Sequence, residues 1–97
     1  MKRHEFHSEA ELELLAAADF YEARKVGLGI RFLLAVDGAI ERLKFDPEAR
    51  PKTLFDVRRQ PVKDFPFDVL YLDEPDRIWI VAVAHYSRKT AFWRRRS

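Results

Sequence analysis

The order of elements that the sequence predicts indicates a small α+β domain, with a helical hairpin packed on one face of a largely antiparallel sheet (β-α-α-β-β-β). Two apolar runs near the C-terminus, residues 65–71 and 78–85, are separated by the charged segment Asp73-Glu74-Pro75-Asp76, as in a β-hairpin. Two stretches with helical spacing of apolar residues precede them, and a short alternating segment opens the chain. Amphipathic helices need an apolar surface to cover, and the sheet provides one.

The composition describes one domain, residues 1–97. Of these 97 residues, 47% are hydrophobic, which is enough for a single small core. The absence of cysteine excludes a disulfide scaffold and thiolate metal sites. No apolar run is long enough to cross a bilayer, and the N-terminus is charged instead of carrying an apolar signal core. We therefore expect a soluble cytoplasmic protein without a metal or a cofactor.

The first helix is expected to begin at a capping box and to end near residue 24 or 25. In Ser8-Glu9-Ala10-Glu11, the Ser8 side chain accepts from the backbone N–H of Glu11, and the Glu11 carboxylate reaches back to the N–H of Ser8. The segment before it, residues 2–7, is predicted as an opening strand. One apolar stripe of the helix should face the core: Leu14, Leu15, Ala18 and Tyr21.

The second helix follows an interruption at Gly27 and Gly29 and ends near Lys44, before Asp46-Pro47. Its apolar positions recur at helical spacing: Phe32, Val36, Ile40 and Leu43. Two such helices joined by a short link form an antiparallel hairpin. The segment 46–53 is predicted as a loop, because its two prolines keep it out of regular structure.

Three strands are expected after this loop. Residues 54–62 form the first, which Pro61 places at a sheet edge or strand end, because proline donates no ladder hydrogen bond. The strand 78–85 is apolar on both sides, so it should lie at the centre of the sheet. Regular alternation assigns its residues to two faces, Ile78, Ile80, Ala82 and Ala84 to one, and Trp79, Val81, Val83 and His85 to the other.

Charge is distributed unevenly, although the net charge is only +2. Between Ser8 and Tyr21 the charged residues are all acidic, whereas from Tyr86 to the end they are all basic. This split indicates a basic face that can meet a polyanion or an acidic protein partner. The basic end of the chain is therefore the first candidate for a functional surface.

A set of residues in the second half of the chain forms a distinctive combination: Arg58, Arg59, Phe65-Pro66-Phe67, Val69, Tyr71, Ala82-Val83-Ala84-His85, Arg88 and Trp93. Together with the helical hairpin and its Phe20-Tyr21-Glu22, this combination resembles the RelE/ParE superfamily, the toxins of bacterial type II toxin–antitoxin modules. The resemblance covers nearly the whole chain. It implies a toxin neutralised by a cognate antitoxin, in a toxin dimer or a toxin–antitoxin heterotetramer. The pattern is closer to the ParE-like branch, the plasmid stabilisation type.

The two branches of this superfamily differ in their targets. Members resembling ParE poison DNA gyrase and are not known to need a nuclease site. Members resembling RelE cut mRNA on the ribosome without a metal. The resemblance to ParE implies a gyrase inhibitor, with a ribosome-dependent mRNA endonuclease as the alternative. A domain that keeps this fold, has lost toxicity and only binds its antitoxin is the third hypothesis.

Basic and aromatic residues near the matched motifs are the candidates for binding the target or a nucleic acid: Arg58, Arg59, Lys63, Tyr86, Arg88, Lys89, Trp93 and Arg95. Metal-free RNA cleavage needs a proton-transfer group and cations on the scissile phosphate, so His85 and Arg88 are the catalytic candidates if the chain is RelE-like. Both have structural alternatives. His85 at the end of an apolar strand can serve as a hydrogen-bonding residue, and Arg88 is equally suited to pair with the acidic first helix. Trp93 is also expected to close the core, with its indole N–H at the surface.

Overall fold

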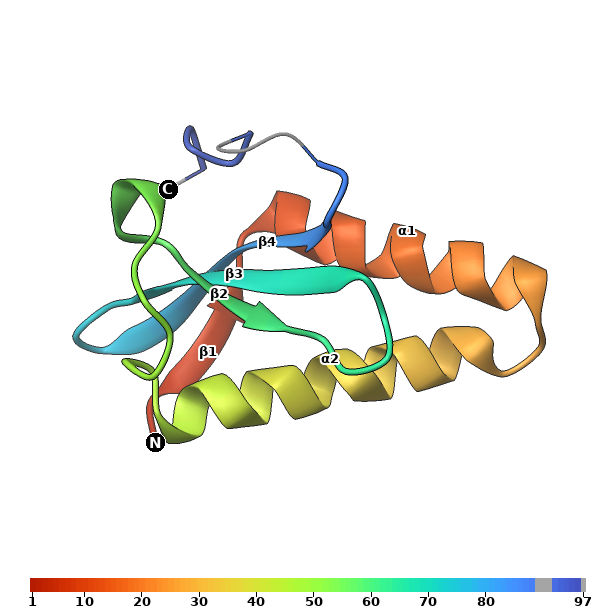
Figure 1. Cartoon of the computed structure of the whole chain (residues 1–97), viewed down its shortest axis with the longest axis horizontal. Helices are drawn as coiled ribbons and strands as arrows, with labels where there is room; N and C mark the ends of the chain where they lie inside the picture. The colour runs from red at the N-terminus through yellow and green to blue at the C-terminus, as the bar shows by residue number, and fades with distance from the viewer. Residues whose placement is uncertain (89–91, 97) are drawn as a thin grey trace.

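The computed structural model describes residues 1–88 and 92–96 of the chain. Its elements in chain order are β1 (Arg3–Phe6), α1 (Ser8–Arg24), α2 (Leu28–Phe45), a short 3₁₀ helix η1 (Leu54–Asp56), β2 (Arg58–Pro61), β3 (Phe67–Asp73) and β4 (Arg77–His85). Figure 1 shows the two long helices side by side, and the sheet next to them. The predicted α+β class and the order β-α-α-β-β-β are confirmed.

The strands form one mixed sheet in the order β1-β4-β3-β2. β1 runs parallel to β4, whereas β3 is antiparallel to both β4 and β2. The central position of β4, between β1 and β3, is as predicted from its two apolar faces. β2 lies at the edge of the sheet. Proline has no N–H to donate, and an edge strand tolerates this because it pairs on one side only.

Apolar side chains pack on both faces of the sheet. The face toward the helices buries one cluster, whose largest members are Phe32, Val36, Ile40, Leu43, Phe67, Val69, Tyr71, Ile78, Ile80 and Val83. The second face buries a smaller cluster: Val57, Leu70, Val81, Ala82, Ala84 and Trp93. Trp93 belongs to residues 92–96, which we call the C-terminal turn. This turn closes the face that the helices do not cover.

The alternation of β4 reverses once, so the predicted assignment of its faces is only partly right. The register between β3 and β4 shifts by one residue, which leaves Val81 as an extra residue in β4. A β-bulge of this kind moves the later side chains to the opposite face. Ile78 and Ile80 therefore face the helices, whereas Ala82 and Ala84 lie on the second face.

α1 begins without the predicted capping box. Ser8 is already the first helical residue, and the cap is His7, whose Nδ1 accepts the backbone N–H of Glu9 at 3.0 Å. The imidazole thus takes the role that the hydroxyl of Ser8 was expected to have. The predicted end near Arg24 is confirmed. Leu15 was assigned to the core stripe in error, because its side chain is 49% exposed.

Gly29 lies inside α2 instead of interrupting it. Only Gly27, with a φ of 87°, has the left-handed conformation that separates the two helices. A Cβ on Gly29 would lie 2.7 Å from the carbonyl oxygen of Ala18, so this glycine permits the close approach of α2 to α1. The Glu22 carboxylate accepts the N–H groups of both glycines, at 3.0 Å each, and so satisfies donors at the start of α2.

Only the second half of the predicted strand 54–62 is a strand. Phe55 and Asp56 adopt left-handed conformations, with φ values of 59° and 65°. A left-handed residue cannot continue an extended ladder, so pairing with β3 begins at Arg58. Both the N–H and the hydroxyl of Thr53 donate to the carbonyl oxygen of Val57, at 2.6 Å, which closes this turn.

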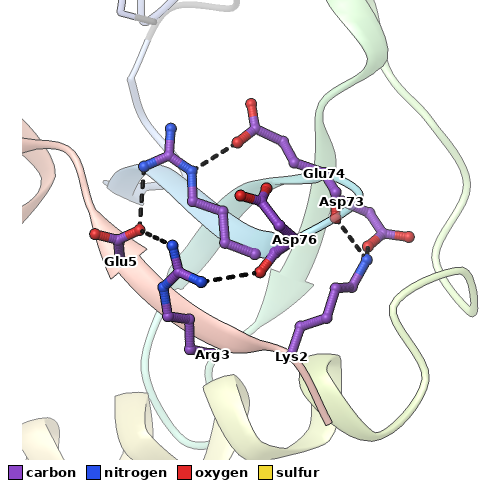
Figure 2. A network of polar contacts seen from close by, with 7 residues as sticks. Lys2, Arg3, Glu5, Asp73, Glu74 and Asp76 are labelled. Atoms are coloured by element: carbon purple, nitrogen blue, oxygen red, sulfur yellow. Dashed lines mark hydrogen bonds and ion pairs between the residues drawn. The ribbon is translucent and has the colours of Figure 1, made fainter.

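Charged side chains tie β1 to the turn between β3 and β4, as Figure 2 shows. The network consists of Lys2, Arg3, Glu5, Asp73, Glu74, Asp76 and Arg77. Lys2 pairs with Asp73, and Arg77 pairs with Glu5 at 3.2 Å. These pairs join residues distant in sequence, and they fix the register of the short parallel pairing between β1 and β4.

Candidate functional site

The chain leaves the sheet at the end of β4, where His85 and Tyr86 lie at the surface. Nδ1 of His85 accepts the backbone N–H of Ser87 at 3.0 Å, and the ring meets Phe67 edge-on, with 5.3 Å between centroids. The N–H of Tyr86 donates to the carbonyl oxygen of Pro66 at 2.9 Å. The backbone is thereby fixed, while the Tyr86 side chain stays 56% exposed.

Glu13 of α1 anchors this end of the chain. Its Oε1 accepts the backbone N–H of Val83 at 3.1 Å and meets Nη1 of Arg96 at 2.9 Å, while its Oε2 pairs with Nη1 of Arg88 at 3.3 Å. β1 pairs with β4 only as far as Ile80, so the carboxylate satisfies a strand N–H beyond the end of β1. The structural alternative for Arg88, a pair with the acidic first helix, is therefore observed.

The C-terminal turn packs against the second face of the sheet through Arg96 and Trp93. Arg96 also donates to the carbonyl oxygen of Val81 at 3.1 Å. The Trp93 ring meets Phe55 edge-on, at 6.1 Å between centroids, which places the turn beside the loop before β2 (Figure 1). Trp93 is 2% exposed, and its Nε1 is buried without a partner among the described residues, so the indole N–H does not lie at the surface as expected. The residue closes the core.

Arg58 and Arg59 lie on β2, away from the end of β4. Arg58 pairs in register with Tyr71, whereas His85 pairs with Phe67. Four residues of strand separate these positions, about 13 Å along β3. Nη1 of Arg59 pairs with Asp68 at 3.3 Å, and Nη1 of Arg58 donates to a loop carbonyl, that of residue 50. Both arginines are thus used within the fold.

Three predicted residues remain, and the structure describes two of them. Lys63 is exposed in the turn between β2 and β3, and Arg95 is exposed in the C-terminal turn. Lys89 lies outside the described residues. We treat the end of β4 and the C-terminal turn as one group, because Arg88 lies over the Phe92 ring and shares Glu13 with Arg96. The loop before β2 lies beside this turn, whereas Lys63 lies in the turn between β2 and β3.

The chemistry of this group suits binding better than proton transfer. Nδ1 of His85 is occupied by the backbone N–H of Ser87. Arg88 is held by a carboxylate and lies over the Phe92 ring at 3.7 Å. Exposed Tyr86 and Arg95 present an aromatic ring and a cation on an ordered backbone, which suits contact with a protein or a polyanion. Among residues 1–88 and 92–96, no His, Asp and Glu cluster is placed to hold a metal ion, and no helix is long and apolar enough to cross a membrane.

Two features of this end were not predicted as such. The acidic character of α1 indicated an ion-pair partner for Arg88, but helical spacing gave no reason to choose Glu13 among its neighbours. Arg96 was part of a basic run whose members the sequence did not distinguish, yet its guanidinium spans Glu13 and a β4 carbonyl. Both contacts bridge distant parts of the chain, so no local pattern identifies them.

Comparison with solved structures shows that this fold is known. A chain in the structure described as "Chromosomal ParDE TA system from P. aeruginosa", a toxin–antitoxin (TA) system, matches with a TM-score of 0.63. The match covers 88% of this chain and 96% of that chain, at 21% sequence identity, and it therefore shows a shared fold. No protein-family model matches the sequence, and the search of curated proteins finds no match.

Proposed function

We propose that the chain is the toxin of a type II toxin–antitoxin module, of the ParE type, and that it arrests growth in the cytoplasm by poisoning DNA gyrase. The observation that carries this proposal is the fold shared with a chain of a ParDE system over nearly the full length of both chains. The combination of residues around Phe65-Pro66-Phe67 and Ala82-Val83-Ala84-His85 supports it independently.

Inducible expression in a bacterial host tests the target. A gyrase poison produces filamentous cells with induced DNA-damage response, and the purified protein inhibits supercoiling by gyrase. Abrupt translation arrest with cuts in mRNA would instead identify the RelE-type endonuclease. Normal growth at confirmed expression of folded protein would leave the non-toxic, antitoxin-binding domain as the function.

The target-binding surface in this proposal is the end of β4 with the C-terminal turn. Tyr86 and Arg95 are its exposed contacts, and Arg88 contributes while held by Glu13. Arg58 and Arg59, like Arg88, have partners within the fold, so all three are weaker candidates than Tyr86 and Arg95. The combined change Tyr86→Ala and Arg95→Ala should abolish toxicity without lowering Tm, whereas the matched control Arg24→Ala on α1 should remain toxic. Full toxicity of the folded double variant would remove this surface from the proposal.

A cognate antitoxin is the partner that this function requires. The helical hairpin leaves apolar side chains exposed for it: Leu12, Leu15, Phe20, Val26, Ile30 and Leu34. Adjoining exposed apolar side chains can mark a protein interaction site, and Ile30 and Leu34 adjoin because they lie one turn apart on α2. Co-expression with the product of an adjacent small open reading frame should restore growth and give a complex that co-purifies. A neighbouring product that neither restores growth nor co-purifies would contradict the assignment to a toxin–antitoxin module.

A further inference from the structure

Two adjoining surface hollows lie between α2 and the turn that joins β2 to β3. The first, of about 370 Å³, is lined by Arg42, Arg50, Gln60, Pro61 and Lys63. The second, of about 340 Å³, shares Arg42 and Lys63 and extends along α2 to Arg31. We call the two together the cationic groove. Its four cations come from three separate parts of the chain, so no sequence run reveals it.

The cations of the groove differ from several arginines elsewhere in the described residues, which are paired with carboxylates. Arg59, Arg77, Arg88 and Arg96 each pair with a carboxylate. Within residues 1–88 and 92–96, Arg31, Arg42, Arg50 and Lys63 form no ion pair. The first hollow has no acidic lining residue, and the second has one, Asp64. Unneutralised cations that converge on one groove create a positive potential that attracts an anionic ligand.

A glycine in the middle of α2 lines the groove, although glycine is unfavourable inside a helix. Gly38 lines the second hollow. A Cβ there would approach only Nη1 of Arg42, at 3.4 Å, so contacts with the core do not require the glycine. Its effect is to keep the helix backbone open beneath the guanidinium of Arg42, where a ligand can come close.

We propose that the cationic groove binds the phosphodiester backbone of a nucleic acid, without reading its bases. Three guanidinium groups match phosphate geometry through paired N–H donors. Apolar groups are few beside the four cations: Pro61 in the first hollow, and Leu34 and Ala35 of α2 in the second. No aromatic ring lines either hollow, so base stacking, the usual source of single-strand recognition, has no platform there. This inference does not depend on the proposed gyrase target.

Fluorescence anisotropy with a short fluorescein-labelled DNA duplex tests the groove. Binding should weaken steeply as salt rises from about 50 to about 200 mM, because phosphate contacts release counterions. Arg42→Ala and Lys63→Ala should each lower the slope of log K against log salt by about one, and two duplexes of different sequence should bind alike. Tm should stay within error of the parent, since both side chains are exposed and form no ion pair in the described part of the chain.

Two control variants separate the groove from other basic surfaces. Arg24→Ala removes an exposed cation of α1, and Arg94→Ala removes one from the C-terminal turn; both should keep the parent slope. If Arg94→Ala lowers the slope and the groove variants do not, the C-terminal turn is the nucleic-acid surface and the proposal is wrong. Absence of duplex binding at low salt, or preferential binding of labelled poly-glutamate, would equally overturn it.

Discussion

Two glycines of α2 sit in opposite surroundings, so alanine should have opposite effects at the two positions. A Cβ at Gly29 would meet the Ala18 carbonyl oxygen at 2.7 Å, and this backbone atom cannot move alone. Overpacking of this kind costs about 1–3 kcal/mol. A Cβ at Gly38 would meet only the flexible end of Arg42, so the better helix propensity of alanine should dominate, by about 0.5–1 kcal/mol.

Thermal unfolding measures this contrast directly. For a domain of this size, 1 kcal/mol corresponds to a change in Tm of roughly 4–8 °C. Gly29→Ala should lower Tm and Gly38→Ala should raise it. A fall in Tm for Gly38→Ala would mean that the backbone there is needed for packing after all.

Glu13 is the residue whose carboxylate connects α1, β4 and the C-terminal turn. Its side chain is only 15% exposed. Glu13→Ala leaves the N–H of Val83 without its side-chain acceptor, and it leaves the guanidinium of Arg96 with the Val81 carbonyl but without its carboxylate. Loss of a buried acceptor costs about 1–3 kcal/mol. Glu13→Gln keeps an acceptor for Val83 but removes the charge, so its unfolding free energy should fall between those of the parent and Glu13→Ala.

Urea unfolding of these variants requires a control on the same helix. Glu11→Ala is suited to this, because the Glu11 side chain is exposed and forms no ion pair within the described residues. Its unfolding free energy should fall by less than that of Glu13→Ala, because an exposed charge in the first turn contributes only about 0.3–1 kcal/mol through the helix dipole. Equal midpoints for Glu11→Ala and Glu13→Ala would show that the carboxylate of Glu13 does not hold the C-terminal turn.

At the scale of elements, β1 packs against the end of α2 through a titratable contact. Burial lowers the pKa of His4 below its usual 6.5, and the nearby charge of Lys44 lowers it further. Nζ of Lys44 lies 3.2 Å from Nδ1 of His4 and can donate to it only while that nitrogen is unprotonated. The unfolded chain therefore binds a proton that the folded chain resists, and stability from this contact is lost as pH falls below 6.5.

The free energy of unfolding, measured by urea at about pH 7.5 and about pH 5.5, should therefore decrease toward the acid side, before most carboxylates titrate. His4→Gln should remove much of this decrease. Lys44→Ala should reduce it by less, because burial is the larger cause. A pH dependence that is identical in the parent and in His4→Gln would show that another group is responsible.

The elements themselves were largely predictable, whereas the details that depend on tertiary contact were not. Apolar residues on both faces of β4 correctly indicated that this strand is central, because a strand with two apolar faces needs to be covered on both sides. The bulge at Val81 left no signal, since a one-residue register shift is compatible with any apolar strand. Gly29 resembled a helix breaker in the sequence. A glycine is needed there because α2 approaches α1 closely, and the sequence of α2 alone does not reveal that contact.

At the scale of the whole molecule, the same distinction applies to the candidate site. Charge patterning predicted the basic end, and it correctly suggested a partner for Arg88 on the acidic helix. It did not separate Arg58, on the edge strand β2, from Arg88, which follows β4, because strand order and register together set that distance. The cationic groove was missed for the same reason. Only Lys63 was a candidate, and its neighbours Arg42 and Arg50 belong to other segments.

The fold as a whole depends on the core that β4 shares with the helices. Ile80 and Val83 are at most 2% exposed and belong to the cluster beneath α1 and α2. Truncation of a buried aliphatic side chain to alanine costs about 2–4 kcal/mol through lost burial and the cavity that remains. A small domain has only about 5–15 kcal/mol of stability in total, so either variant should unfold a measurable population near physiological temperature.

Differential scanning calorimetry of Ile80→Ala and Val83→Ala should show Tm values far below that of the parent, and any toxicity should decline with the folded fraction. Leu15→Ala is the matched control, because it removes a similar volume from a side chain that is 49% exposed. That variant should unfold at nearly the parent temperature. If all three variants have the Tm of the parent, the side chains of β4 do not stabilise the core. The inference that β4 positions the basic end would then be wrong as well.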